Sequence, residues 1–238
     1  MADPKSILVN IHSIANIEDV ITTLQQLDNK LVELGLHQFM LFNQSYQIVT
    51  HLIQQRVNDD YFKNPIFIEK FIVNFASYYF KAVNNAMDGN ELSPPWSKLN
   101  DYAKIKSAPV FISLMLGANV HINNDLPRVL KEMMQDESMR NLFSDILKID
   151  RILMKSGRQI IDLFEENNKF LDFLKRRLIF TYYRPAMYTI LHWRVQAWRH
   201  YGMLKRDDRV SASITKRSLK IANRLLFIAR FLGKNNHN

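Results

Sequence analysis

Residues 64–87 read NPIFIEKFIVNFASYYFKAVNNAM, and this stretch decides the fold class. Asn64 followed by Pro65 is a typical helix start, because asparagine can cap the first turn and proline fits the first helical position. Phe75 and Tyr79 follow at a spacing of four residues, which places them on one face of a helix. The stretch therefore predicts one long helix that ends near residue 87.

The same helical pattern extends in both directions along the chain. There are only 6 Gly and 7 Pro in 238 residues, which leaves little turn chemistry for many short strands. Gly35 is a natural stop for the first helix, and the clearest loop covers residues 88–95. We expect helices at residues 18–34, 38–57 and 64–87, from about 96 and about 108, at 137–167 (one long helix or a kinked pair), and at 169–181, 185–204 and 210–232. The prediction is an all-α, single-domain bundle of about 7–9 helices that spans residues 1–238.

Composition limits the classes of protein to which the chain can belong. It has no cysteine, which excludes disulfides, thiolate-bound zinc and a cysteine nucleophile. Residues 1–10 lack the basic-then-apolar order of a signal peptide. The longest apolar-rich run, residues 108–120, has about 13 residues, whereas a membrane span needs about 20. We therefore expect a cytoplasmic protein without a transmembrane helix.

The net charge of +9 is unevenly distributed. From Lys175 to the C-terminus there are fifteen lysines and arginines but only two acidic residues, Asp207 and Asp208, whereas the rest of the chain has a small excess of acidic residues. Such an asymmetry indicates an anionic partner, which could be nucleic acid, a phospholipid surface or an anionic substrate.

One motif stands out, LGANVHINNDLP at residues 116–127. His121 and Asp125 are four residues apart and share a helix face, and Gly117 would let a neighbouring group approach that face closely. Asp125 could orient the imidazole and leave its other nitrogen as a catalytic base or acid, or both residues could ligate a metal. The structural alternative is that the two hydrogen-bond each other, or that Asp125 caps a helix beginning at Leu126.

Further polar and aromatic side chains extend this candidate site. Asn119 and Asn123 flank His121 and are predicted to bind polar groups of a substrate. Arg194 and Trp198 are four residues apart on a later helix, where an arginine beside aromatic rings would suit an anionic or planar ligand. The structural alternative buries Trp198 in the core and pairs Arg194 with a carboxylate.

The stretch from Gly117 to Leu126 resembles the signature of an uncharacterised bacterial family, a domain of unknown function that carries Gly-Met/Ala-Asn-x-His-Ile-Asn-x-Asp-Leu. Three other elements fit the same family: His51-x-x-x-x-Arg56-Val57, Phe75-Ala76-x-x-Tyr79 and Trp193-Arg194-x-x-x-Trp198. The likeness covers about residues 46–204. It implies a helical fold and names no activity.

A more distant likeness concerns mechanism. Leu116-Gly117-x-x-x-His121-x-x-x-Asp125-Leu126 is similar to the corresponding helix of zinc-dependent phospholipase C and its single-strand nuclease relatives, in which the matching His and Asp bind zinc. This sequence lacks the histidine expected soon after Pro127, and His192 is followed four residues later by Gln196 in place of glutamate. The resemblance implies at most one divalent metal ion, for which zinc is the best candidate, with His51 or His192 as further ligands.

The last predicted helix, residues 210–232, is basic and amphipathic. Its basic residues are expected opposite an apolar stripe of Ile221, Leu225, Ile228 and Leu232. Such a helix either packs on the domain with its basic face in solvent or is exposed to an anionic membrane or polyanion. No pattern typical of sequence-specific nucleic-acid binding accompanies it.

Two functions follow from these patterns. One is an enzyme that acts through His121 and Asp125 on a small or lipid-like molecule, which could be anionic, with metal-dependent hydrolysis as one form of this chemistry. The other is a non-catalytic helical protein that docks to an anionic membrane or polyanion through its basic C-terminal helices. Convergence of the predicted site residues on one cavity would favour the enzyme. No pattern predicts an oligomeric state.

Overall fold

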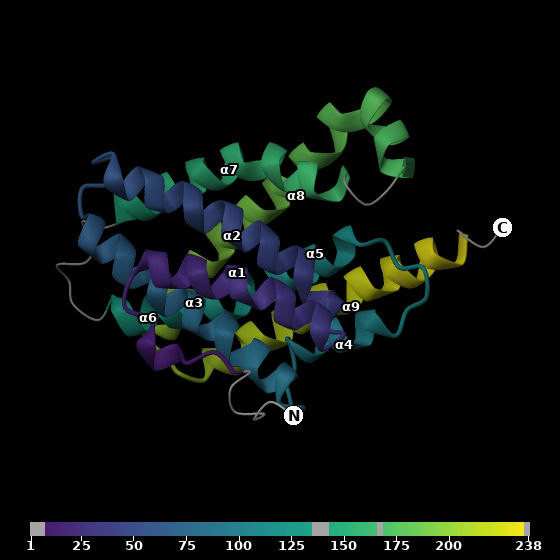
Figure 1. Ribbon diagram of the computed structural model, residues 1–238. Coiled ribbons are helices and arrows are strands. Elements are labelled where there is room, and N and C mark those ends of the chain that lie inside the picture. Colours follow the sequence, from purple (N-terminus) through teal and green to yellow (C-terminus); the bar gives the residue numbers. More distant parts are fainter. Residues whose placement is uncertain (1–7, 135–142, 166–168, 236–238) are drawn as a thin grey trace.

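The computed structural model describes residues 8–134, 143–165 and 169–235, and in these ranges it contains helices and no strand (Figure 1). The all-α prediction is therefore confirmed. The elements are η2 (Ile11–Ser13), α1 (Ile17–Glu33), α2 (His37–Asn58), α3 (Pro65–Met87), α4 (Ser97–Ala103), α5 (Phe111–Val120), the π-helix η3 (His121–Asp125), α6 (Leu126–Met133), α7 (Phe143–Glu165), α8 (Lys169–Leu204) and α9 (Val210–Asn235). None of the described helices is long and apolar enough to cross a membrane.

Local signals set the ends of the first helices much as the sequence predicts. At the start of α3, the side chain of Asn64 accepts a hydrogen bond from a first-turn backbone N–H, and Pro65 takes the first helical position. Helix α1 begins with a reciprocal capping pair formed by Asn16 and Asp19. Its end is followed by Gly35, whose φ of +67° lies in the left-handed region that favours glycine.

The prediction of two helices at residues 169–181 and 185–204 is wrong, because α8 is one helix with Pro185 inside it. A proline removes one backbone hydrogen bond, and a helix can continue when its neighbouring turns pack well. After the proline, Met187, Ile190 and Trp193 are buried in the core. The predicted helix at 137–167 corresponds to α7, and its residues 137–142, 166 and 167 lie outside the described residues.

The apolar face of α9 also differs from the predicted stripe. Ile228 is exposed, while the buried apolar side chains of α9 are Ile214, Ala222, Leu226 and Ala229. Helix α9 packs mainly on α5 and α4, with further contacts to η3 and α8 (Figure 1). The helix is therefore attached to the rest of the protein along one side and presents the other side to solvent.

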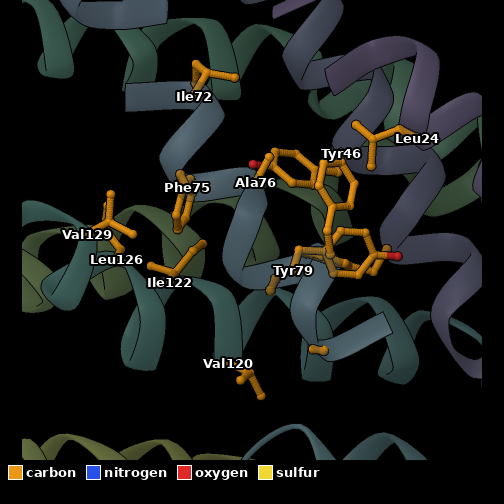
Figure 2. Packing of buried hydrophobic residues seen from close by; sticks show 14 of the residues in the cluster. Leu24, Tyr46, Ile72, Phe75, Ala76, Tyr79, Val120, Ile122, Leu126 and Val129 are labelled. Carbon is orange, nitrogen blue, oxygen red and sulfur yellow. The ribbon is translucent and has the colours of Figure 1, made fainter. Parts of the chain in front are cut away.

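The core places residues 116–127, the LGANVHINNDLP motif, among the buried helices. Aromatic side chains of α2 and α3, among them Tyr46, Phe75 and Tyr79, face the α5–η3–α6 segment that carries Ile122 and Leu126 (Figure 2). The π-helix itself contacts α3, α5, α6, α8 and α9. Five helices therefore fix the position of the motif.

A buried amide, that of Asn43, joins the first three long helices. Asn43 on α2 donates to the carbonyl oxygen of Leu24 and to Asp28, each at 2.8 Å, and accepts the hydroxyl hydrogen of Tyr79 at 3.1 Å. These hydrogen bonds tie α1, α2 and α3 together. Buried amides with satisfied partners of this kind specify one arrangement of the helices around them.

Asp145 on α7 joins that helix to the start of α3. Its carboxylate accepts hydrogen bonds from the backbone N–H groups of Lys63 at 3.0 Å and Asn64 at 2.7 Å, and from the Lys148 ammonium at 2.9 Å. Burial by itself would raise the pKa of Asp145, but these donors stabilise the charged form and hold the pKa below its usual value.

Candidate functional site

The motif residues lie in a continuous helical segment whose middle turn is a π-helix. α5 leads directly into η3, and η3 leads directly into α6. Asp125 has helical dihedral angles (φ −86°, ψ −44°) and its side chain makes no capping hydrogen bond, so the predicted cap at this position is wrong. Single π-turns inside α-helices are rare and are found frequently at functional sites.

His121 is buried, with 3% of its surface exposed, and its two ring nitrogens have different surroundings. Nδ1 lies 3.3 Å from Oδ2 of Asp125. Because a carboxylate only accepts hydrogen bonds, the imidazole donates from Nδ1, and Nε2 then carries the lone pair. Nε2 is buried and has no hydrogen-bond partner among the described residues.

An aromatic cage surrounds the imidazole. Its ring stacks on Phe75 with centroids 3.6 Å apart and planes inclined by 10°. Tyr46 and Phe42 approach edge-on, with centroids at 5.1 and 5.7 Å, and the ring of Trp96 lies 6.3 Å away. The cage fixes the plane of the imidazole and shields it from water.

Asp125 is held by three donors. Besides His121, the indole Nε1–H of Trp96 donates to Oδ2 at 3.2 Å and the amide of Asn124 donates to Oδ1 at 2.8 Å. Both carboxylate oxygens are therefore engaged within the protein. This arrangement satisfies the hydrogen-bonding capacity of a carboxyl group that is only 2% exposed.

Burial is the main influence on the protonation of His121. It lowers the pKa of the imidazole, and the positive charge of Arg194 lowers it further, whereas the hydrogen bond and charge of Asp125 raise it. The net direction is downward, so the imidazole is neutral at pH 7. A neutral, oriented imidazole with a free Nε2 lone pair is the form that acts as a general base.

Gly117 allows the close approach that its position predicts, and the group that approaches is Phe42. A Cβ atom at residue 117 would lie 2.6 Å from Cγ of the Phe42 ring and 2.9 Å from its Cβ. Helix α2 therefore packs tightly against α5 at this point. The missing side chain serves helix packing and places Phe42 beside His121.

The structure does not bring Asn119 and Asn123 to the imidazole as substrate-binding groups. Asn119 donates to the carbonyl oxygen of Ser218 on α9 at 3.0 Å, and Asn123 donates to Oδ1 of Asn119 at 3.1 Å. Both amides are fully buried and hold α9 against the motif. Their predicted role is corrected to a structural one, because a helix places residues two positions from His121 on nearly the opposite face.

Arg194 is buried, and Trp198 is half-buried against the core, but each contacts different groups. The Nε–H of Arg194 on α8 is hydrogen-bonded to the carboxylate of Asp150 on α7, and Nη2 is buried without a partner in the part of the chain that the structure describes. The ring of Trp198 packs edge-on against Phe143 and Tyr201, at 4.8 and 5.8 Å. The predicted clamp of Arg194 and Trp198 is therefore not formed.

The predicted metal site is not assembled. His51 and His192 are exposed, whereas His121 and Asp125 are buried and hydrogen-bonded to each other. The described residues contain no group of three or more His, Cys, Asp or Glu side chains that could hold a metal ion. Structural and catalytic zinc sites use at least three protein ligands, so the residues present do not fit a zinc site.

Two hydroxyl groups that the sequence analysis did not single out belong to the same region. Tyr46 and Thr50 lie one turn apart on α2, are 8% and 0% exposed, and have no hydrogen-bond partner for their hydroxyl groups among the described residues. Burial raises the pKa of Tyr46, and the charge of Asp125 raises it further, so the phenol remains protonated. The sequence signal that could have identified this hydroxyl group is a threonine, Thr50, at a position of α2 where the neighbouring buried residues are apolar.

Two hollows of the described surface lie away from His121. The more evident depressions are a groove along α9 and a recess between α1 and residues 8–13, and His121 lines neither of them. The rings of His121 and Tyr46 are in contact, and Thr50 on α2 and Arg194 on α8 are also buried polar residues; we call these four residues the buried polar cluster.

Comparison with known proteins places the sequence in a family without a known activity. A family model described as a family of unknown function (DUF5995) matches residues 17–232. The comparison with curated proteins gives no match. No solved structure matches the chain.

Proposed function

The chain belongs to this family of unknown function, and we propose that it is an enzyme in which His121 is the general base for a reaction of a small anionic molecule. The observation that carries the proposal is the contrast between the two imidazole nitrogens. Nδ1 is fixed by Asp125, and Nε2 is buried with no partner in the described ranges. Buried polar atoms in proteins are almost always hydrogen-bonded, so this exception calls for a functional explanation.

The pairing of His121 with Asp125 suits proton abstraction. The carboxylate selects the tautomer with hydrogen on Nδ1 and stabilises the imidazolium that forms when Nε2 accepts a proton. Burial favours the neutral imidazole before the reaction. A water molecule or a substrate hydroxyl group at Nε2 would therefore meet an unprotonated base, and hydrolysis of an ester is the reaction class that we infer.

The anionic character of the substrate rests on the donors of the buried polar cluster. Nη2 of Arg194 and the hydroxyl groups of Tyr46 and Thr50 are buried donors without partners among the described residues. The positive charge of Arg194 is also one of the influences that lower the pKa of His121. Guanidinium and hydroxyl donors match carboxylate and phosphate oxygens.

Access to this base requires movement of the surrounding helices, because His121 and Arg194 are 3% and 4% exposed. Opening of this kind is common in enzymes that exclude water from the reacting groups. The mechanism includes no metal step, since the described residues do not assemble the ligands for one.

The test uses the anionic esters p-nitrophenyl phosphate and bis(p-nitrophenyl) phosphate as substrates for the full chain, with uncharged p-nitrophenyl acetate for comparison. Turnover by the wild type should fall by about 10²-fold or more in His121→Gln, as expected for loss of a general base. The variant His51→Gln changes an exposed histidine and is the matched control. Circular dichroism checks that each variant is folded.

A second readout examines the imidazole without relying on turnover. Nitrogen-15 NMR of labelled histidine should show the Nδ1–H tautomer for His121, and the Nε2 signal should shift when acetate or inorganic phosphate is added. Equal turnover by wild type and His121→Gln on a hydrolysed ester, or an Nε2–H tautomer, would overturn the proposal.

A further inference from the structure

The solvent face of α9 combines large apolar side chains with a row of cations. Phe227, Ile228 and Phe231 are 69%, 43% and 60% exposed. Lys220 and Arg224 precede them on the same face, and both are exposed. These five residues are called the α9 face. Each lies three or four positions from at least one of the others, with Phe227 and Ile228 adjacent, so a helix gathers them on one side.

The charge of the helix is entirely of one sign. Residues 210–235 contain six lysines and arginines and no acidic residue. The acidic residues closest in sequence precede the helix, where Asp207 is paired with Arg209 and Asp208 with Lys131, and no ion pair involves Lys220 or Arg224 among the described residues. The cations of the α9 face therefore remain available to an external anionic surface.

The helix is anchored so that this face stays outward. Ile214, Leu226 and Ala229 are buried on the opposite side, and Ser218 accepts the hydrogen bond of Asn119. Near its end, a Cβ at Gly233 would lie 2.7 Å from the carbonyl oxygen of Lys106, so the backbone of α9 rests directly on the loop before α5. The exposed aromatic rings are therefore held in place on a rigid support.

We infer that the α9 face docks this protein on an anionic phospholipid membrane, with Phe227, Ile228 and Phe231 entering the boundary between headgroups and acyl chains. Basic helices with aromatic and aliphatic residues on one face lie in this way in the plane of a membrane surface. The cations contact anionic headgroups, and the apolar residues supply the second signal that firm binding requires.

A membrane explains the α9 face better than a nucleic acid does. A helix that binds the phosphates of a nucleic acid does so through cations and polar groups. The exposed side chains of Phe227, Ile228 and Phe231 would contribute little to such binding. No described helix is apolar enough to span a bilayer, so the contact would be peripheral. This inference is independent of the reaction proposed at His121.

The experiment is sedimentation of the full chain with phosphatidylcholine vesicles, with and without phosphatidylserine, at low and physiological salt. We expect binding only when phosphatidylserine is present, and weaker binding at higher salt. Phe227→Ser/Phe231→Ser should reduce the partition coefficient at least about tenfold. Lys220→Glu/Arg224→Glu should reduce it by about fivefold or more for each cation.

The controls are exposed residues of the same types elsewhere. Ile66 is 66% exposed at the start of α3, and Arg199 is exposed on α8. Ile66→Ser and Arg199→Glu should bind vesicles like the wild type, and circular dichroism should show unchanged helicity for all variants.

Each other outcome overturns the inference. Absence of vesicle binding by the wild type excludes a membrane. Binding to an RNA homopolymer that survives Phe227→Ser/Phe231→Ser, without vesicle binding, assigns the cations to a nucleic acid. A wild-type dimer in sedimentation velocity that dissociates in the phenylalanine variant, without vesicle binding, assigns the α9 face to a second copy of the chain.

Discussion

The imidazole of His121 lies face to face with the ring of Phe75, with centroids 3.6 Å apart and planes inclined by 10°. The stack covers one face of the imidazole and leaves the hydrogen bond from Nδ1 to Asp125 in its plane. An apolar face disfavours the charged imidazolium, and the carboxylate at the edge favours it. Burial outweighs the carboxylate, so the pKa of His121 is lowered.

Because of this balance, we expect His121 to make the free energy of unfolding depend on pH. Because the folded-state pKa lies below the unfolded value of about 6.5, the unfolded chain takes up the proton first. The stabilisation is complete above about pH 6.5 and is lost as the pH falls below it, with a slope of at most about 1.4 kcal/mol per pH unit. Urea unfolding should show that this component is absent in His121→Gln; identical pH profiles for both proteins would contradict it.

A second prediction concerns Gly117 and its contact with Phe42. Gly117→Ala should destabilise the protein by about 1–3 kcal/mol, because the new methyl group would overlap a ring held within the core. The cost should decrease when Phe42→Leu is also present. Urea unfolding of the two single variants and the double variant measures this coupling.

Gly202 provides the control for that substitution. It also lies in a helix, and a Cβ there would meet nothing within 4 Å. Gly202→Ala should leave the free energy of unfolding unchanged or raise it by up to about 1 kcal/mol, through helix propensity alone. Similar losses at both glycines would contradict the tight packing of Phe42 on α5.

The parts of the fold that the sequence predicts well are those set by local interactions. Asn64 and Pro65 start α3, and Gly35 ends α1, because caps and turns involve only neighbouring residues. Pro185 misled the prediction of α8, since a local helix breaker was overridden by the packing of the turns that follow it. Tertiary packing also explains the error in α9, where Ile228 was predicted to be part of the buried stripe and is exposed.

The candidate site divides in the same way. The contact of His121 with Asp125 follows from a spacing of four residues and was predictable. The partner of Asn119 was not, because Ser218 lies 99 residues away in sequence and only the folded helices bring them together. The ring of Trp96 likewise reaches the site through tertiary packing. The exposed positions of His51 and His192 depend on helix rotation, which spacing alone does not fix.

A third prediction concerns the carboxylate that joins α7 to α3. Asp145→Asn should lower the free energy of unfolding by about 1–3 kcal/mol at neutral pH, because an amide offers one acceptor where the backbone N–H groups of Lys63 and Asn64 use both oxygens. The depressed pKa of Asp145 means that its stabilisation is present above about pH 3.9 and is lost as the pH falls below that value.

Denaturant unfolding between neutral and acidic pH measures both effects of Asp145→Asn. Asp59→Asn is the comparison, because Asp59 is exposed and pairs only with Arg56 at the surface. Its loss should stay below about 1 kcal/mol. A variant at Asp145 that behaves like Asp59→Asn would show that the hydrogen bonds to the start of α3 contribute little.

The last prediction addresses the ion pair of Arg194 and Asp150. The guanidinium is 4% exposed and the carboxylate 19% exposed, so the pair is largely shielded from water. Asp150→Ala should destabilise the protein by about 3–5 kcal/mol, because it leaves a buried cation without its counter-charge. Asp208→Ala removes the exposed partner of Lys131 and should cost at most about 1 kcal/mol.

The double variant Arg194→Met/Asp150→Leu should recover most of the loss caused by Asp150→Ala, since apolar residues of similar volume need no counter-charge. Chemical unfolding of the variants gives these differences. If Asp150→Ala is no more costly than Asp208→Ala, Arg194 is hydrated in solution and the buried polar cluster is open to water.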